Sequence, residues 1–289
     1  MIKKGIILAG GHGTRMSPLT KAVNKQLLPI YDKPLIYYPL SVLMLAGIRD
    51  ILIIVNKGQL FQFRKLLSDG KKLGIKISYA EQTKPKGLPD AFILGEKFIG
   101  NSSVALILGD NFFYGQSLTN KLKKFLKIKT GSRILLHPVK KPELYGVAEV
   151  DIKYKIKSLK EKPKNSKSNL AITGLYLFDN KVIKYSKSLK PSKRNELEIV
   201  DLLNKYKQKK KLSAEFLGRG GAWLDTGSID DFYNTSAFVS ALENRQGFKI
   251  ACLEEIAINN GWINKAKIKE AISFYGNCIY SGYLKKLIR

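Results

Sequence analysis

The sequence is poor in the residues that build disulfide-rich, histidine-ligated or membrane-spanning proteins. Only two cysteines, Cys252 and Cys278, and two histidines, His12 and His137, occur among 289 residues. Two late cysteines cannot make a disulfide framework, and two histidines cannot make a histidine-rich transition-metal site. No apolar run approaches the roughly 20 residues of a membrane-spanning helix. We therefore expect a cytoplasmic protein with no membrane partner.

Acidic residues are also scarce, with 23 Asp and Glu against 51 Lys and Arg, which gives a formal net charge of +28 at pH 7. Such a charge suits nucleic acid or another polyanion. However, lysines are spread along the chain, and aromatic residues are not interleaved with the basic runs as they are in a base-stacking surface. The charge thus favours solvated lysine-rich faces and no specific nucleic acid. A basic nucleic-acid-binding protein stays open as an alternative of another class.

A glycine-rich turn near the N-terminus is the most informative segment. Ile6–Ala9 is a short apolar run, as expected of a parallel strand buried on both faces. Gly10, Gly11 and Gly13 lack Cβ, so the chain can turn sharply and its N–H groups can approach an anion. Arg15 adds a permanent positive charge. This order of residues predicts a phosphate site.

Neither of the two common phosphate loops fits this turn. A dinucleotide fingerprint would need a glycine where the chain has Met16, and a P-loop would need Gly-Lys-Ser/Thr at the end of the turn. Lys25 and the Lys33–Pro34 pair place further positive charge after the turn. The sequence therefore indicates a phosphate site of a different kind.

Apolar runs alternate with amphipathic stretches in the first half of the chain. We expect strands at Ile6–Ala9, Ile51–Val55, Ile75–Ala80 and Val104–Leu108, and helices at Leu35–Ala46, Leu60–Leu67 and Ala91–Phe98. The alternation implies a parallel sheet with ligand loops at the carboxyl ends of its strands. Further strands are expected at Ile134–Val139, Val147–Val150, Ile156–Leu159 and Ile172–Phe178. The segment Asp230–Leu242 and most of the remainder should be helical.

Two aspartates are candidate metal ligands. Asp110 directly follows an apolar run, so its carboxylate emerges where a buried strand ends, and Asp225 lies in the segment Trp-Leu-Asp-Thr-Gly. Magnesium favours one or two carboxylates, with phosphate and water completing the shell. Alternatively, Asp110 caps the next turn and Asp225 caps a helix that begins near Ser228. Spacing alone leaves both interpretations open.

These segments resemble the motifs of the sugar-phosphate nucleotidylyltransferases. The resemblance covers nearly the whole chain and is closest to the thymidylyltransferases of that family. It rests on motifs in the family's order, namely Leu8–Arg15 with Pro18, Lys25, Pro29 and Asp32–Pro34, then Gly109–Asn111, Tyr145–Val147, Glu161–Pro163 and Trp223–Gly227.

The resemblance implies a particular architecture. This is an α/β fold with a Rossmann-like mixed, mostly parallel sheet flanked by helices (the nucleotide-diphospho-sugar transferase fold), with a smaller sugar-binding sheet and C-terminal helices. We expect residues 1–240 to form the nucleotidylyltransferase core, including the sugar-binding lobe. Residues 241–289 should form a helical region that packs on the core and serves assembly or regulation.

The resemblance also implies an activity, the transfer of a thymidylyl group from dTTP to glucose 1-phosphate with Mg²⁺, which gives dTDP-glucose and pyrophosphate. This would be the first step of dTDP-rhamnose-type sugar synthesis. The sugar phosphate is already an anion and can attack the α-phosphorus directly, so alignment and charge neutralisation suffice. A UTP-dependent uridylyltransferase remains an alternative, because Lys86–Asp90 departs from the Gly-Leu-Ala-Gln pattern of thymidylyltransferases.

Site residues are inferred by matching positions to the family's motifs. The expected catalytic residues are Arg15, Lys25 and Lys162, and the expected metal ligands are Asp110 and Asp225. Expected nucleotide-binding residues are Gly10, Gly11, Gly13, Thr14, Gln82 and Gly87, of which Gln82 and Gly87 would read the base. Expected sugar-phosphate-binding residues are Gly146, Glu161, Tyr176 and Arg194. A homotetramer with a second, regulatory nucleotide site is also implied, with Arg219, Arg245, Ala251 and Glu255 as its candidates.

Overall fold

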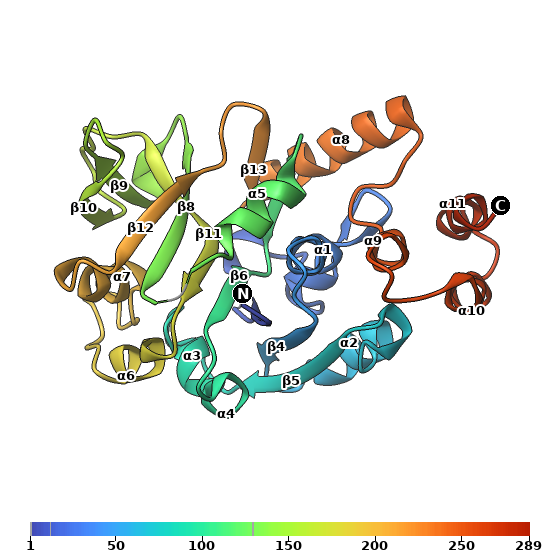
Figure 1. Ribbon diagram of the computed structural model, residues 1–289, viewed down its shortest axis with the longest axis horizontal. Coiled ribbons are helices and arrows are strands. Elements are labelled where there is room, and N and C mark those ends of the chain that lie inside the picture. Colours follow the sequence, from blue (N-terminus) through green and yellow to red (C-terminus); the bar gives the residue numbers. More distant parts are fainter. Residues whose placement is uncertain (1, 12, 129) are drawn as a thin grey trace.

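A four-stranded parallel block forms the centre of the computed structural model, which describes residues 2–11, 13–128 and 130–289 (Figure 1). Its strands are β1 (Lys4–Ala9), β4 (Asp50–Asn56), β5 (Lys76–Gln82) and β6 (Val104–Leu108), in the order β5-β4-β1-β6. Along the chain, β4 and β5 are added on one side of β1, and β6 then pairs on the other side. The carboxyl ends of β1 and β6 flank this switch point, where open α/β sheets bind ligands.

The strands of the second half extend the same sheet. They are β8 (Ser132–Pro138), β9 (Gly146–Val150), β10 (Ile156–Glu161), β11 (Leu170–Phe178) and β12 (Leu212–Phe216). The central strand β11 pairs antiparallel with β6 and also with β8 and β9. The expected mixed sheet is therefore confirmed. The strands expected in a smaller sugar-binding sheet instead continue the main one, because β11 joins the two halves into nine strands.

Two short ribbons lie outside the main sheet, and neither was predicted. One pairs β7 (Asn111–Gly115) with β13 (Gly221–Asp225), so that Asn111 lies opposite Asp225. The other pairs β2 (Pro29–Ile30) with β3 (Lys33–Pro34). Short 3-10 turns complete the connections at Thr14–Met16, Lys25–Leu27, Lys71–Leu73 and Pro142–Leu144.

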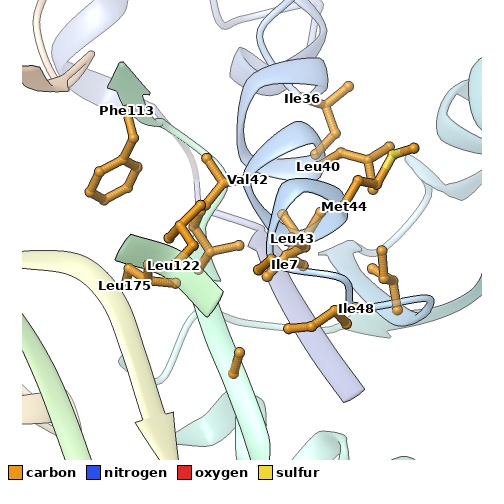
Figure 2. Close-up of a cluster of buried hydrophobic side chains, with 14 of the residues drawn as sticks. Ile7, Ile36, Leu40, Val42, Leu43, Met44, Ile48, Phe113, Leu122 and Leu175 are labelled. Atoms are coloured by element: carbon orange, nitrogen blue, oxygen red, sulfur yellow. The ribbon is translucent and has the colours of Figure 1, made fainter. Parts of the chain in front are cut away.

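Helices cover both faces of the sheet. One face carries α1 (Tyr37–Leu45), α2 (Leu60–Leu67) and α5 (Leu118–Phe125), and the other carries α3 (Asp90–Leu94), α4 (Glu96–Ile99), α6 (Lys181–Lys187) and α7 (Ile199–Gln208). Neighbouring residues of β1 point into different cores: Ile7 packs with α1 (Figure 2), and Ile6 packs in the core that contains Phe92. Burial on both faces explains why β1 is a continuous apolar run.

Two expected helices differ in the structure. The segment Leu35–Ala46 was expected to be amphipathic, but α1 is buried all round from Tyr37 to Met44. The reason is that α9 (Leu253–Asn259) packs on the side of α1 that faces away from the sheet (Figure 1). The prediction of a single helix at Ala91–Phe98 is wrong, because this segment forms two short helices, α3 and α4, separated at Gly95.

The C-terminal part consists of α8 (Ile229–Gln246), α9, α10 (Lys265–Tyr275) and α11 (Ile279–Leu287). The Ser228 side chain caps α8 by accepting from the Asp231 N–H, so Ser228, and not Asp225, fills the capping position. Helix α8 runs through residue 240, and the division expected at 240/241 therefore falls inside an element. The division itself stays a prediction.

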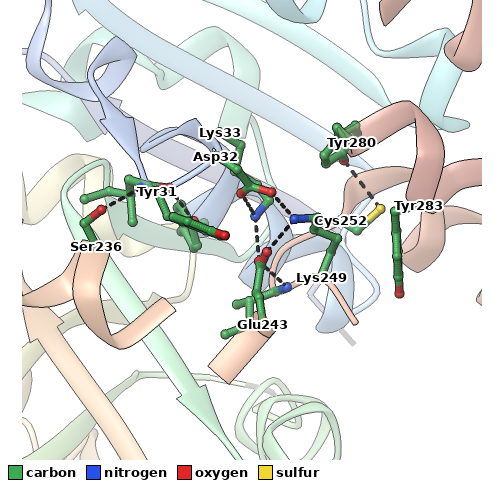
Figure 3. Close-up of polar contacts among 12 residues, drawn as sticks. Tyr31, Asp32, Lys33, Ser236, Glu243, Lys249, Cys252, Tyr280 and Tyr283 are labelled. Carbon is green, nitrogen blue, oxygen red and sulfur yellow. Dashed lines mark hydrogen bonds and ion pairs between the residues drawn. The ribbon is translucent and has the colours of Figure 1, made fainter. Parts of the chain in front are cut away.

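Four charged side chains, Asp32, Lys33, Glu243 and Lys249, form a cluster that links the end of α8 to the β2–β3 ribbon (Figure 3). The Lys33 Nζ atom lies 2.8 Å from Glu243 and 2.5 Å from Asp32. Lys249 pairs with Glu243 at 2.8 Å and also with Asp32. The side chains of Lys33 and Glu243 are only 2% and 3% exposed, so this pair is sealed inside the protein, whereas Asp32 keeps 18% of its side chain exposed.

The last helices are held by a second buried carboxylate. Glu254 accepts hydrogen bonds from the hydroxyl groups of Tyr275 at 2.9 Å and of Tyr280 at 2.6 Å. The Tyr275 hydroxyl also lies 3.0 Å from that of Tyr37 in α1. These contacts join α9, α10 and α11 to the first helix.

Candidate active site

A cavity of about 350 Å³ opens beyond the carboxyl ends of the parallel strands, and a second of about 230 Å³ adjoins it. The first is lined by the expected site residues Gly10, Gly11, Arg15, Gln82, Gly87, Asp110, Gly146, Glu161, Lys162, Tyr176, Arg194 and Asp225. The second adds Gly13, Thr14 and Lys25 and shares Gly10, Gly11, Arg15 and Asp110 with the first. Residues expected to bind nucleotide, sugar phosphate and metal therefore meet in one place.

The Lys25–Asp110 pair lies where the two cavities meet. Lys25 Nζ is 2.8 Å from Asp110 Oδ2, and the lysine is buried. Asn24 fixes the preceding backbone, because its Nδ2 donates to the Ala9 carbonyl at 3.0 Å and its Oδ1 accepts from the Gln26 N–H. Burial alone would raise the pKa of Asp110, but the adjacent Lys25 ammonium lowers this pKa below the usual value. Asp110 is therefore ionised at neutral pH.

Asp225 reaches the same place from the β7–β13 ribbon, opposite Asn111. The Thr226 N–H and hydroxyl both donate to the Asp110 carbonyl, at 3.1 and 2.9 Å, and so bind the end of β13 to the end of β6. Burial, and then the charge of Asp110, raise the pKa of Asp225 to about 7. Two carboxylates this close together, and partly shielded from water, are stabilised by a cation.

The donor set fits a hard divalent cation. Asp110 and Asp225 offer carboxylate oxygens, which Mg²⁺ prefers, with positions left for phosphate and water. Among residues 2–11, 13–128 and 130–289, no group of three or more His, Cys, Asp or Glu side chains could hold a metal by itself. A metal at this pair would therefore need ligands from the substrate.

Asn111 connects three parts of the site and was not identified as a site residue from the sequence. Its Nδ2 donates to Asp110 Oδ1 at 3.1 Å. Its Oδ1 accepts from the Trp223 indole at 2.6 Å and from the Gly174 N–H at 2.9 Å. A Cβ on Gly174 would lie 2.3 Å from that oxygen, so only glycine fits there. Asn111 therefore sets the position of the Asp110 carboxylate.

The expected base-reading residues lie at the side of the cavity formed by β5. Gln82 is the last residue of β5 and is 6% exposed. A Cβ on Gly10 would lie 1.8 Å from Gln82 Nε2, so the absence of a side chain at position 10 makes room for this amide. Gly87 has φ +101° and bridges to Leu197, whose N–H donates to the Lys86 carbonyl at 2.7 Å. This bridge joins the two sides of the cavity.

The expected sugar-phosphate residues lie on the other side. Arg194 Nη2 contacts Glu161 at 3.2 Å and Glu198 at 2.6 Å, so both carboxylates hold this guanidinium. Burial, and then the charge of Glu198, raise the pKa of Glu161. Lys162 has φ +42°, an unusual conformation for a lysine, and its N–H donates to the Tyr145 carbonyl at 3.0 Å. Glu198 was missed by the sequence analysis.

The glycine-rich turn carries Arg15 to the mouth of the site, where its side chain is exposed. Gly11 and Gly13 have φ of +109° and +59°, which glycine adopts without strain. A Cβ on Gly227 would lie 3.0 Å from Arg15 Nη2 and 3.2 Å from Asp225 Oδ2, so the guanidinium and the carboxylate flank the same glycine.

Tyr176 has a mixed role in the structure. It lines the first cavity, yet it is 3% exposed and belongs to the core that contains Phe178. Its ring stacks on Phe178 with centroids 6.3 Å apart. Burial raises the pKa of its hydroxyl far above the usual value. Tyr176 therefore closes the cavity wall as a neutral side chain.

The four expected regulatory residues do not share one cavity. Ala251 and Glu255 line a separate cavity of about 570 Å³, which Lys123 and Lys249 also line. Arg219 and Arg245 are not among its lining residues. Arg219 precedes β13, and Arg245 lies in the last turn of α8.

Comparison with known proteins places this architecture in a family. The family model described as nucleotidyl transferase matches residues 4–241. The chain belongs to this family, and it is a nucleotidyltransferase by fold and by descent.

Relatives of nearly identical length carry a more specific name. Glucose-1-phosphate thymidylyltransferase of Neisseria meningitidis serogroup A is 51% identical over 286 residues, 99% of each chain. The protein of that name from Mycobacterium tuberculosis is 47% identical over 285 residues, 99% of each chain.

Solved structures agree with this placement. A crystal structure from Bacillus anthracis, described as a glucose-1-phosphate thymidylyltransferase in complex with sucrose, is 40% identical with a TM-score of 0.75, covering 81% of this chain and 94% of that one. A UDP-glucose pyrophosphorylase bound to UDP-glucose is 29% identical with a TM-score of 0.73, covering 85% of this chain and all of that one. None of the helices in the described parts of this chain is long and apolar enough to cross a membrane.

Proposed function

We propose that this enzyme transfers a thymidylyl group from dTTP to glucose 1-phosphate and releases dTDP-glucose and pyrophosphate. The observation that carries the proposal is that residues from five distant sequence motifs line one pair of adjoining cavities. Relatives 51% identical over the full length bear the corresponding name.

The triphosphate would bind over the glycine-rich turn. Gly11 and Gly13 allow backbone N–H groups to face phosphate oxygens, and Arg15 and Lys25 offset the charge that develops on the leaving pyrophosphate. Asp110 and Asp225 would hold Mg²⁺. When bound, this ion would neutralise phosphate charge and orient the oxygens around the α-phosphorus.

The sugar phosphate would bind at the opposite wall. Lys162 and Arg194 hold the attacking phosphate, while Glu161 accepts hydrogen bonds from sugar hydroxyls and Gly146 permits close approach of the backbone. A Cβ at position 146 would lie 3.1 Å from Val200 Cγ2 and 3.4 Å from the Glu161 carboxylate, so a side chain here would crowd this wall of the cavity. In-line displacement then needs alignment of two anions and no covalent enzyme intermediate.

A panel assay tests this function directly. Pyrophosphate release is measured with dTTP, UTP, dCTP, dATP and dGTP against several sugar 1-phosphates, with and without Mg²⁺. We expect the highest kcat/KM with dTTP and glucose 1-phosphate, and no turnover after the metal is removed by chelation. A clear preference for UTP would instead support the uridylyltransferase alternative, to which the 29% identical UDP-glucose pyrophosphorylase corresponds.

We also propose a homotetramer with a second nucleotide site at the cavity lined by Ala251 and Glu255. Lys123, which lines the same cavity, supplies positive charge for a diphosphate, whereas the charge of Lys249 is already paired with Asp32 and Glu243. A downstream product such as dTDP-rhamnose would bind there and inhibit. Its inhibition pattern is measured on wild type, on Glu255→Ala, and on Arg219→Ala as a variant outside the lining of this cavity, and the mass of the protein is measured in solution. Purely competitive inhibition, unchanged in both variants, would place the inhibitor in the active site.

A further inference from the structure

Asn56 lies between two parts of the site that are far apart in the sequence. It is the last residue of β4, and β4 pairs in parallel with β1 on one side and β5 on the other. The carboxyl ends of these strands therefore meet. On one side of Asn56 is the turn that begins at Gly10, and on the other is Gln82, its register partner in β5.

The orientation of the Asn56 amide follows from two bonds to one residue. The Gly11 N–H donates to Asn56 Oδ1 at 3.0 Å, and Asn56 Nδ2 donates to the Gly11 carbonyl at 2.8 Å. A backbone N–H can only donate and a carbonyl can only accept. Rotation of the Asn56 amide by half a turn would break both bonds, so its oxygen must face Gln82.

This oxygen in turn fixes the direction of the Gln82 amide. Gln82 Nε2 donates to Asn56 Oδ1 at 3.0 Å. If the Gln82 amide were reversed, its oxygen would face the Asn56 oxygen with no hydrogen between them. Gln82 is only 6% exposed, so water cannot easily replace the lost bond. Gly10 leaves the space that Nε2 occupies.

We propose that Asn56 is a specificity-determining positioning residue, which holds the Gln82 amide in one orientation so that the cavity presents its donor and acceptor in a fixed order. The inference rests on the proposed function, in which Gln82 reads the base. Within the parts of the chain that the structure describes, the bond to Asn56 is the only side-chain hydrogen bond of Gln82. Its oxygen and second N–H are therefore available to a ligand.

The order of donor and acceptor distinguishes two kinds of pyrimidine. Thymine and uracil present a ring N–H beside a carbonyl oxygen, whereas cytosine presents a ring nitrogen acceptor beside an amino donor. An amide that could rotate would match either pattern. An amide held by Asn56 matches only one of the two patterns. A base with the other pattern would leave buried polar groups without hydrogen-bond partners, which is strongly disfavoured.

The test compares two selectivity ratios in Asn56→Ala. The kcat/KM ratio of dTTP to dCTP should fall by about tenfold, because Gln82 is free to turn. The ratio of dTTP to dUTP should stay within about twofold, since these bases share the same hydrogen-bonding edge. General damage to the site would lower all three rates together and leave the first ratio unchanged.

Asn56→Asp supplies the conservative comparison. A carboxylate still accepts from the Gly11 N–H and from Gln82 Nε2, so we expect the dTTP:dCTP ratio to be retained while KM rises for every triphosphate. Asn264→Ala is the matched control for loss of stability. Asn264 is an exposed N-cap of α10 whose Oδ1 accepts from the Lys267 N–H, so its loss should leave both ratios unchanged.

A double-mutant cycle shows whether Asn56 acts through Gln82. In the Gln82→Ala background, Asn56→Ala should change the dTTP:dCTP ratio by less than about twofold. An undiminished effect in that background, or an unchanged ratio in Asn56→Ala alone, would overturn the proposal. If Asn56→Ala does not fold, a lost dTTP:dCTP ratio in folded Asn56→Asp would overturn it as well. Failure of the wild type to use any triphosphate would instead refute the proposed function.

Discussion

Lys25 and Lys33 lie on the same short stretch of chain and pair with carboxylates in opposite surroundings. Both lysines are buried. The partner of Lys25, Asp110, keeps 25% of its side chain exposed to the cavities, whereas Glu243, a partner of Lys33, is 3% exposed. An ion pair open to a cavity can exchange its partners for a ligand, while a sealed pair can only hold the fold. Access, more than the residue types, therefore separates a functional pair from a structural one.

The largest effect should come from the open side of this comparison. Asp110→Asn and Asp225→Asn should each lower kcat by about 100-fold or more, because a neutral amide is a poor ligand for a hard cation. Thermal unfolding should change little. The exposed Asp69→Asn is the control, and turnover should be unaffected there. Undiminished turnover in both variants would show that the two carboxylates do not bind the metal.

The sealed Lys33–Glu243 pair should respond in the opposite way, with a loss of stability and no loss of turnover. Glu243→Gln leaves Lys33 buried with reduced compensation and should lower the free energy of unfolding by about 3–5 kcal/mol, measured in urea. The folded fraction should keep the kcat of the wild type. The exposed Lys187–Glu96 pair gives a matched control, since Glu96→Gln should cost no more than about 1 kcal/mol. Equal losses in the two variants would contradict the distinction drawn between open and sealed pairs.

Two cations of the open site sharpen the comparison further. Arg15→Ala should chiefly raise KM for the triphosphate, and Lys162→Ala should chiefly impair use of the sugar phosphate, each by about 10- to 100-fold in kcat/KM. Both constants are measured for both substrates. If Lys162→Ala changes neither constant for the sugar phosphate, the assignment of this lysine is wrong.

The smallest effect concerns pH. Although burial opposes it, the charges of Lys33 and Lys249 lower the pKa of Asp32 in the folded protein. A carboxyl group whose pKa is lowered by folding contributes stability above its unfolded value of about 4, and this contribution is lost as pH falls through the folded pKa. Asp32→Asn should therefore flatten the loss of thermal stability between pH 5 and pH 3. A curve parallel to that of the wild type would show that Asp32 does not contribute.

The sequence predicted the parallel half of the fold well, and the reason is local. Buried parallel strands are continuous apolar runs, so β1, β4, β5 and β6 were found within one or two residues of their ends. The ribbon of β7 and β13 was missed because its strands are short and pair across more than 100 residues. The all-round burial of α1 was missed because it depends on α9, which no local pattern reveals.

The candidate site shows the same difference between features that a local sequence pattern reveals and features that depend on distant contacts. Motif resemblance predicted Asp110, Lys25 and Lys162 as site residues, and all three line the cavities. Asn111 and Asn56 act by holding other side chains, and such roles depend on contacts that appear only after folding. One signal was available for Asn56: a polar residue directly after the predicted strand Ile51–Val55 marks the edge of the sheet where ligands bind.

The contact between Asn111 and Gly174 also limits how this enzyme can change. The glycine has no room for a methyl group, because the Asn111 oxygen would lie 2.3 Å away, and the same oxygen is bound to the Trp223 indole at 2.6 Å. A larger residue at position 174 requires a change at Asn111, and a change at Asn111 removes the bonds to Gly174 and Trp223. Libraries designed to broaden the choice of sugar should therefore leave this pair untouched and vary the cavity wall around Leu144 and Ile172.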